Sequence, residues 1–207
     1  MVISNDERHT ASLYSELLKA HGSSFRSLNW GSEEGQRLRF EVLSGVGKLQ
    51  GARVLDVGCG LGHFACWMEA CGIEVEYTGV DLSAKLLEQA ARDNPGLRFI
   101  EGSILDSQTV LDEEFDYVFA SGLFYSYRES GEEAIKRTVT RMWELARVGV
   151  AFNTLSGWTE DKSENEFYAD PLKTVAFCQS LSPWLVFRHD YHPRDFTVYL
   201  TREARCA

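Results

Sequence analysis

The chain has 207 residues, of which 44% are hydrophobic and 25% are charged. This balance excludes a disordered or fibrous protein and favours one globular domain over two small ones. The net charge of −10 disfavours nucleic acid and anionic membrane surfaces as partners, because both carry negative charge. The five cysteines show no C-x-x-C spacing, and no apolar run resembles a signal segment or a membrane span. We therefore expect free thiols, no metal site and a cytoplasmic protein.

The first 50 residues predict a helical cap that precedes the rest of the chain. Leucines recur at helical spacing over residues 13–18, and Gly-Ser-Ser at 22–24 then interrupts the helix. A second helix is expected to begin near Ser32, because two glutamates follow this serine and acidic residues suit a helix N-terminus. It should end at the glycine-containing turn of residues 45–51.

From residue 51 onward, strand patterns alternate with helix patterns. The expected strands cover residues 53–57, 75–80, 97–101, 116–121 and 149–154, and the expected helices cover 63–71, 83–93, 132–147 and 171–180. This alternation implies right-handed crossovers and a parallel sheet covered by helices on both faces. Two final strands, 184–188 and 196–201, are too close in sequence for a crossover and should pair antiparallel. The sequence thus predicts one α/β domain over residues 1–207, with the cap at 1–50 and the sheet within 51–207.

A glycine-rich turn follows the first expected strand. Gly58, Gly60 and Gly62 alternate with other residues, which lets the backbone turn tightly and approach a ligand closely. The spacing is G-x-G-x-G, whereas a dinucleotide fingerprint requires G-x-G-x-x-G and a P-loop requires Gly-Lys-Ser or Gly-Lys-Thr. Asp56, two residues before the first glycine, disfavours a pyrophosphate and favours a ligand with a cationic portion.

A second acidic residue, Asp81, lies at the carboxyl end of the second expected strand. An acid about 20 residues beyond such a turn is placed to hydrogen-bond both hydroxyls of a ribose. Leu82 follows and can cover the face of an adenine ring. Because Ser83 already suits the role of helix cap, Asp81 is free for a ligand.

In this order and spacing, four segments resemble the motifs of the class I S-adenosylmethionine-dependent methyltransferases. VLDVGCGLG is similar to the first motif, GVDLS to the second, FIEGSILD to the third and FDYVFASG to the fourth. The resemblance spans roughly residues 30 to 200. It implies a Rossmann-like fold whose seven-stranded, mostly parallel sheet has an antiparallel final strand, and it implies S-adenosyl-L-methionine as the cofactor.

The resemblance also assigns cofactor contacts. The three glycines would line the methionine and ribose of the cofactor, Asp56 would act near its amino group, and Asp81 would hold the ribose. Many relatives carry an acid after the glycine of the third motif, where this chain has Ser103, so Ser103 and the backbone of Ile104 are expected at the adenine. Arg39 resembles an arginine that clamps the cofactor carboxylate in quinone O-methyltransferases, and an exposed helix arginine is the alternative. Cys59 in the glycine turn and Ser121 after the fourth strand complete the predicted cofactor set.

The acceptor is expected beyond the carboxyl ends of the strands. Tyr125, in the aromatic segment after the fourth strand, and His189, beside Asp190, are the candidate catalytic residues, because a histidine can serve as a general base near neutral pH. Aromatic packing and a solvated turn are the structural alternatives for these two residues. The absence of N-P-P-Y, D-P-P-Y and Pro-Cys after the fourth strand disfavours nucleic-acid bases as acceptors.

The sequence therefore predicts an enzyme that transfers a methyl group from S-adenosylmethionine to an oxygen or nitrogen atom of a small molecule. A protein or peptide methyltransferase is an alternative that would need an open groove beside Tyr125 and His189. A protein that binds the cofactor without catalysis would lack an acceptor pocket. The glycine spacing disfavours a nicotinamide-dependent dehydrogenase.

Overall fold

The computed structural model describes residues 5–109, 111, 114–127 and 130–204. The chain begins with α1 (Asn5–His21), a 3-10 helix η1 (Phe25–Leu28) and α2 (Glu33–Ser44), before any strand. The alternating part comprises β1 (Arg53–Val57), α3 (His63–Ala70), β2 (Glu76–Asp81), α4 (Ala84–Asp93), β3 (Arg98–Glu101), β4 (Phe115–Ala120), η2 (Phe124–Ser126), α5 (Gly131–Leu145), β5 (Ala146–Leu155), α6 (Pro171–Leu181), β6 (Leu185–Arg188) and β7 (Asp195–Thr201).

The strands form one seven-stranded sheet with the order β3-β2-β1-β4-β5-β7-β6. Neighbouring strands among β1 to β5 pair in parallel, whereas β7 is antiparallel to both β5 and β6. The predicted mostly parallel sheet with an antiparallel final strand is confirmed. The largest difference in boundaries lies between α5 and β5. The helix expected to reach Arg147 ends at Leu145, and the strand expected from residue 149 begins at Ala146, because Ala146 adopts an extended conformation and pairs with Phe115.

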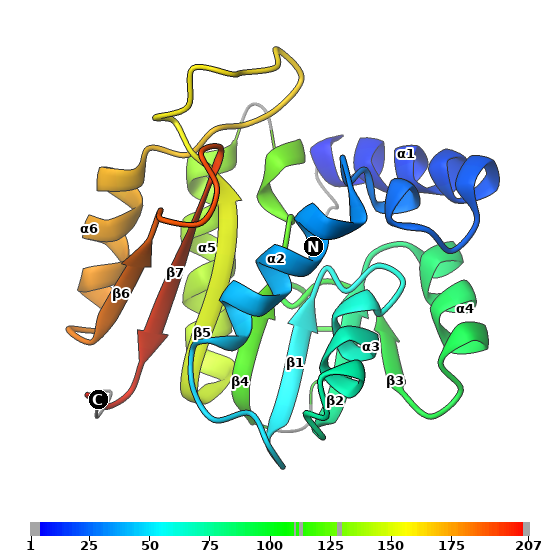
Figure 1. Ribbon diagram of the computed structural model, residues 1–207, viewed down its shortest axis with the longest axis horizontal. Coiled ribbons are helices and arrows are strands. Elements are labelled where there is room, and N and C mark those ends of the chain that lie inside the picture. Colours follow the sequence, from blue (N-terminus) through cyan, green and yellow to red (C-terminus); the bar gives the residue numbers. More distant parts are fainter. Residues whose placement is uncertain (1–4, 110, 112–113, 128–129, 205–207) are drawn as a thin grey trace.

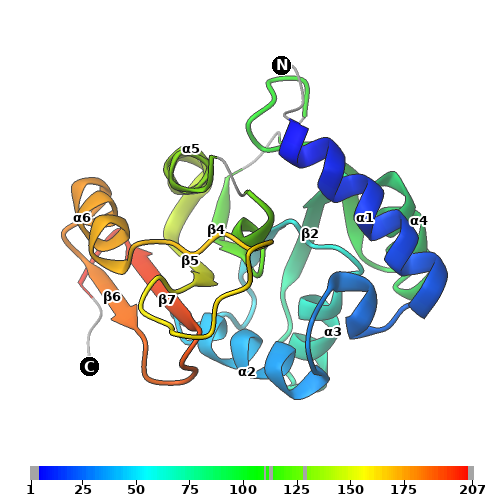
Figure 2. The same cartoon turned by 90° about the horizontal axis from the view of Figure 1, so that it is seen from above.

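Helices cover both faces of the sheet, as the alternation predicted (Figure 2). Side chains of α5 and α6 pack with Leu55, Val118 and Val150 on one face. Side chains of α2 and α3 pack with Val54 and Tyr117 on the other face. Adjacent strand residues therefore contribute to opposite cores, which is the period-two alternation of a strand buried on both sides.

The parallel strands end at one edge of the sheet, and the segments that follow them gather there (Figure 1). The cap helix α1 lies across this edge above α4, and the chain between β5 and α6 lies over the same edge farther along. Side-chain caps fix where the helices at this edge begin: Ser32 accepts from the amide of Gly35, and Ser83 accepts from the amide of Leu86. The sheet thus presents its loops, rather than its faces, to a ligand.

No described helix is long and apolar enough to cross a membrane. The four cysteines within the described residues, Cys59, Cys66, Cys71 and Cys178, are free thiols. The fifth cysteine, Cys206, lies outside the described residues.

The N-terminus of α6 offers a test of local stability. The side chain of Asp170 accepts hydrogen bonds from the amides of Leu172 and Lys173, at 3.0 and 3.2 Å. Replacing it by alanine (Asp170→Ala) removes both acceptors and should lower the free energy of unfolding by about 1 kcal/mol, measured by urea denaturation. Asp170→Asn retains an oxygen acceptor and should stay close to the wild-type value. An equal loss in both variants would show that the carboxylate charge, not the cap, matters.

Candidate functional site

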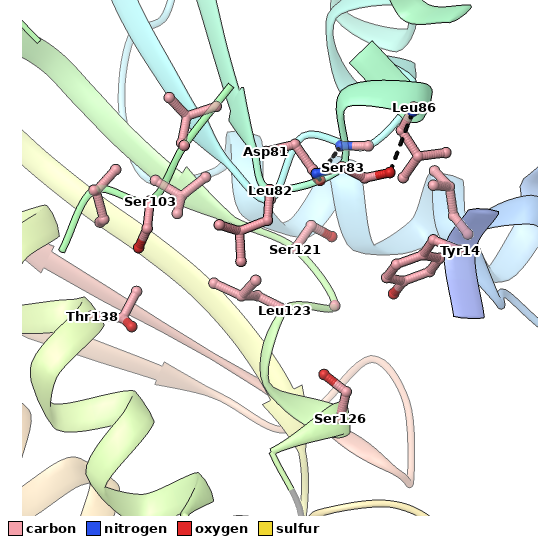
Figure 3. Close-up of a pocket in the computed structure, with 18 of the residues that line it drawn as sticks. Tyr14, Asp81, Leu82, Ser83, Leu86, Ser103, Ser121, Leu123, Ser126 and Thr138 are labelled. Atoms are coloured by element: carbon pink, nitrogen blue, oxygen red, sulfur yellow. Dashed lines mark hydrogen bonds between the residues drawn. The ribbon is translucent and has the colours of Figure 1, made fainter. Parts of the chain in front are cut away.

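A pocket at the carboxyl edge of the sheet collects residues from the loops after β1, β2, β3 and β4 (Figure 3). Seven predicted cofactor ligands line it: Gly58, Gly60, Asp81, Leu82, Ser103, Ile104 and Ser121. Tyr14 of α1 and Thr138 of α5 complete the wall from the two sides. We refer to this cavity as the first pocket.

The glycine turn has the backbone conformation that its sequence suggests. Gly58 and Gly60 adopt positive φ angles of 73° and 55°, a region that side-chain-bearing residues rarely occupy. A Cβ atom on Gly58 would lie 2.8 Å from Leu123, and one on Gly60 would lie 2.6 Å from Leu28. The positive φ angles are the stronger requirement for glycine, because the nearby leucine methyl groups are the ends of flexible side chains, and the turn exposes its backbone to the first pocket. Gly62 is instead the N-cap residue that precedes α3, and it does not line this pocket.

Asp81 is held in place by backbone amides. One carboxylate oxygen accepts from the amide of Gly60 and the other from the amide of Ser83, both at 2.9 Å. Burial raises the pKa of Asp81, and these backbone hydrogen bonds oppose the rise by stabilising the charged form. Two fixed amides thus orient a carboxylate at the wall of the first pocket, beside Leu82.

The loop after β3 forms a further part of this wall. Gly102 donates its amide to the carbonyl of Asp81 at 2.9 Å, which ties this loop to the end of β2. The hydroxyl of Ser103 accepts from the amide of Leu105, and the carbonyl of Ile104 accepts from Arg141 Nε at 3.2 Å. Ser103 and Ile104 are therefore fixed by local hydrogen bonds where they line the pocket.

Two predicted ligands lie beneath the pocket rather than in its lining. Asp56 is 3% exposed and accepts a hydrogen bond of 2.7 Å from the hydroxyl of Tyr77. Burial raises the pKa of Asp56 to about 7, although the Tyr77 hydrogen bond acts in the opposite direction. Cys59 is buried against Gly79, where an added Cβ would lie 2.7 Å from its Sγ. Both residues support the glycine turn from within the fold.

A second pocket, a cavity of about 320 Å³, adjoins the first. The two share Leu28, Trp30 and Gly122 in their linings. The second pocket continues over the ends of β4 and β5 to the turn between β6 and β7. Its remaining lining residues are Asn29, Gly31, Ser32, Gly35, Arg39, Phe124, Tyr125, Asn153, Thr154, Leu155, Glu166, His192, Arg194 and Asp195.

Arg39 lines the second pocket and is buried, so the alternative of an exposed helix arginine is wrong. Its Nη2 atom forms an ion pair with the carboxylate of Asp195, and Nη1 donates to the carbonyl of Gly35 at 2.7 Å. The guanidinium lies 5.1 Å from the ring centroid of Trp30, within the range of a cation–π contact. Its Nε has no hydrogen-bond partner among the described residues. Arg39 therefore joins the N-terminal segment to β7 and keeps one unused donor.

Polar groups at the ends of β4 and β5 have contrasting roles. Asn153 accepts from the amide of Gly122 at 2.8 Å and donates to Ser121 Oγ at 3.2 Å, which fixes the turn after β4. Thr154 is 3% exposed and lines the second pocket, but its hydroxyl makes no hydrogen bond within the described part of the chain. An unsatisfied buried hydroxyl is energetically costly, so Thr154 is a candidate ligand-binding group.

The two predicted catalytic residues are separated. Tyr125 lines the second pocket, and its hydroxyl lies 3.1 Å from that of Tyr14 and 3.2 Å from Asn29 Nδ2. His189 lines neither pocket. Its Nε2 lies 2.8 Å from Ser156 Oγ, and its ring packs against Trp158 and Phe187.

Asp190, the acidic neighbour that suggested His189 as a general base, has another partner. Asp190 pairs with Arg188 at 2.7 Å instead of orienting the histidine. The acidic neighbour that made His189 a candidate base therefore does not support that role, because the side chain of Asp190 forms its ion pair with Arg188.

Comparisons with known proteins agree with this geometry. Residues 54–149 match the family described as a methyltransferase domain. A protein of Mycobacterium tuberculosis whose name assigns it to the methyltransferases is 30% identical over 158 residues, which cover 72% of this chain and 92% of that protein. The chain belongs to the class I S-adenosylmethionine-dependent methyltransferases. The cofactor of this family is S-adenosylmethionine, as the motifs implied.

Two further methyltransferases are similar to this chain, one in part of its sequence and one in its fold. A malonyl-[acyl-carrier protein] O-methyltransferase of Pectobacterium atrosepticum is 32% identical over 108 residues, 51% of this chain and 40% of that protein. The magnesium protoporphyrin IX methyltransferase of Synechocystis PCC 6803, solved with bound S-adenosylmethionine, superposes with a TM-score of 0.68 at 13% identity and covers 98% of this chain and 100% of that one. At that identity the likeness shows the fold alone.

Sequence reasoning singled out Arg39 and Tyr125 but missed most of the other residues that build the second pocket. The partners Arg39 and Asp195 are 156 positions apart, and no local pattern relates them. Trp30 reaches Gly122 from a segment without regular spacing: an added Cβ on Gly122 would lie 2.8 Å from its ring. Thr154 and His192 were visible as polar residues near strand ends, but only the folded chain brings them to one cavity.

The raised pKa of Asp56 predicts a contribution to the free energy of unfolding that depends on pH. The unfolded chain releases the Asp56 proton near pH 4, whereas the folded protein keeps it up to about pH 7. Between these values the unfolded state binds fewer protons, so the free energy of unfolding should fall as the pH rises, on the order of 3 kcal/mol from this residue. Asp56→Asn cannot ionise, so its stability relative to wild type should increase from pH 4 to pH 8 in urea denaturation.

Tyr77→Phe provides the matched control for Asp56. Removing the hydroxyl donor that stabilises the charged carboxylate should move the pH range of the stability change upward. A stability difference between Asp56→Asn and wild type that does not depend on pH would contradict the assignment.

Proposed function

We propose that this methyltransferase binds S-adenosylmethionine in the first pocket and transfers its methyl group to an oxygen or nitrogen atom of a small molecule in the second. The observation that carries the proposal is the contact between the two cavities, which share Leu28, Trp30 and Gly122. Methyl transfer is an in-line displacement, so the acceptor atom must reach the sulfonium methyl without water between them. Adjacent cavities with a common wall meet that requirement.

The ribose, adenine and methionine portions of the cofactor would each contact a different part of the first pocket. Asp81 binds the ribose hydroxyls, since two backbone amides already orient its carboxylate. Leu82, Ser103 and Ile104 surround the adenine, and the exposed backbone of Gly58 and Gly60 faces the methionine portion. The cofactor carboxylate would then lie beyond Trp30 near Arg39, whose buried Nε lacks a partner among the described residues.

The shape of the second pocket supports a small acceptor over a protein or peptide. The protein-methyltransferase alternative requires an open groove shared by Tyr125 and His189, but only Tyr125 lines this pocket. Segments from α2, η2, β5, the chain before α6 and the β6–β7 turn surround it. An acceptor would contact Tyr125 and lie beside the buried, unpaired hydroxyl of Thr154. The presence of this pocket also favours catalysis over cofactor binding alone.

The ribose assignment predicts the effect of changing Asp81. Asp81→Asn retains the side-chain shape but loses the charge and one acceptor, so the dissociation constant for S-adenosylhomocysteine should rise about 10- to 100-fold in calorimetric titration. Asp106→Asn is the matched control, because Asp106 accepts an amide in the next loop and lies outside the first pocket. Unchanged affinity in a folded Asp81→Asn protein would exclude the ribose contact.

The unpaired hydroxyl of Thr154 predicts that its removal affects thermal stability and turnover in different ways. Thr154→Val replaces a hydroxyl that lacks a hydrogen-bond partner in the described part of the chain with a methyl group of similar size, so the melting temperature should stay equal or rise. Methyl transfer to the acceptor should fall at least several-fold while affinity for S-adenosylhomocysteine is unchanged. Thr154→Ser keeps the hydroxyl and should retain turnover. A clear loss of thermal stability in the valine variant would show that the hydroxyl has an internal role instead.

A further inference from the structure

One wall of the second pocket contains a histidine in contact with a buried carboxylate. His192, in the turn between β6 and β7, places its Nδ1 atom 3.0 Å from Oδ2 of Asp195. The Asp195 side chain is 5% exposed and also pairs with Arg39 of α2. The His192 side chain is 31% exposed and lines the pocket. A buried acid therefore holds one ring nitrogen of a histidine whose ring borders a ligand cavity.

The contacts of Nδ1 decide which nitrogen carries the proton. Nδ1 lies near three groups with opposing requirements. The Asp195 carboxylate needs a donor, whereas the backbone amide of Arg194, at 3.2 Å, and Nη2 of Arg39, at 3.5 Å, need an acceptor. A hydrogen bond to an ionised carboxylate is shorter and about twice as strong as one between neutral groups. The Asp195 contact is also the shortest of the three, and Nη2 of Arg39 already pairs with the Asp195 carboxylate. These facts favour a proton on Nδ1 and a lone pair on Nε2.

Nε2 of His192 is available to a ligand. Among the described residues, the polar contacts of this ring all involve Nδ1. The other histidine of the same turn differs, because Nε2 of His189 lies 2.8 Å from Ser156 Oγ and its ring is stacked on Phe187. His192 borders the same cavity as the unpaired hydroxyl of Thr154. Two unused polar groups thus share the proposed acceptor pocket.

We propose that His192 is the general base of the reaction, positioned by Asp195, and that the acceptor is a small molecule with a hydroxyl group. This inference rests on the proposed function of the second pocket. A phenol or alcohol must lose its proton when its oxygen is methylated, so it gains from a base, whereas a carboxylic acid is already ionised at neutral pH. The His192–Asp195 pair can supply the base that a hydroxyl acceptor needs.

The step balances without a further reactant. The acceptor oxygen bonds to the methyl carbon as the carbon–sulfur bond of the sulfonium breaks, and the electron pair of that bond stays on sulfur. The hydroxyl proton moves to Nε2 of His192. The products are the methyl ether, S-adenosylhomocysteine and a protonated imidazole, which then releases its proton to water. Asp195 acts as a positioning residue, because it contacts the base and not the acceptor.

The charges around His192 come from four segments. Arg39 of α2, Arg194 of the same turn and Asp195 of β7 face the ring, and Glu166 from the chain before α6 pairs with Arg194 at 2.7 Å. Burial and the positive charge of Arg39 lower the pKa of His192, while Asp195 raises it less. The ring is therefore neutral at pH 7 and able to accept a proton, and the rate should fall only when the pH drops below the usual imidazole range.

Nuclear magnetic resonance of the imidazole nitrogens tests the proposal without an identified acceptor. The wild-type protein is saturated with S-adenosylhomocysteine, and the folded His192→Gln variant assigns the signal. We expect a neutral ring at pH 7 with its proton on Nδ1 and a titration midpoint below 6.5. A proton on Nε2, or a charged ring at pH 7, would overturn the inference. Failure of S-adenosylhomocysteine to bind would instead contradict the proposed function itself.

A kinetic experiment distinguishes the acceptor class. Phenols and alcohols, with carboxylic acids of matched shape, are offered with labelled S-adenosylmethionine over a range of pH. We expect label on the hydroxyl compounds, a drop in kcat of about 100-fold or more in His192→Gln with little change in KM, and loss of the low-pH limb. His189→Gln tests the alternative histidine of the turn and should retain activity. Preference for the carboxylic acids, or wild-type kcat in His192→Gln, would overturn the inference.

Discussion

The ion pair between Arg39 and Asp195 links the N-terminal cap to the last strand of the sheet inside the protein. Arg39 lies in α2, before the first strand, and Asp195 begins the last strand, β7. Both side chains are almost fully buried, so each charge depends on the other for compensation. Removing one partner of a buried pair typically costs about 3–5 kcal/mol, because the remaining charge is left without water. The position of α2 against the sheet is therefore strongly fixed.

Both pockets depend on that position. The guanidinium of Arg39 contacts the ring of Trp30, and Trp30 forms a wall shared by the first and second pockets. Asp195 in turn contacts His192 at the far side of the second pocket. One buried pair thus sets the wall between the two pockets and also the orientation of the proposed base. In the proposed reaction, the cap would therefore contribute to the chemistry as well as covering the carboxyl edge of the sheet.

The parts that could be predicted from the sequence are those that local physics determines. The glycine turn requires positive φ angles, and the acid after β2 follows from where parallel strands end, so Gly58, Gly60 and Asp81 were found in one pocket. Strand and helix periodicity gave the sheet, with one helix end displaced by two residues where β5 begins early.

The second pocket could not be predicted in the same way. Several of its residues, such as Trp30 and His192, come from segments between helices and strands, and its central ion pair links residues 156 positions apart. The turn between β6 and β7 shows the difficulty most clearly. His189 and His192 are three residues apart and chemically identical, and only the path of the backbone places His192 at the pocket and His189 against Ser156. Sequence alone favoured His189 because an acid follows it, but that acid pairs with Arg188.

The most direct test of the account is a crystal structure of the protein with S-adenosylhomocysteine. We expect the ribose on Asp81, the adenine beside Leu82 and Ile104, and the sulfur atom next to Gly122 and Trp30, where the two pockets meet. In that position a transferred methyl group would face Thr154 and His192. A bound molecule whose sulfur faces away from the second pocket, or one that occupies another part of the surface, would contradict it.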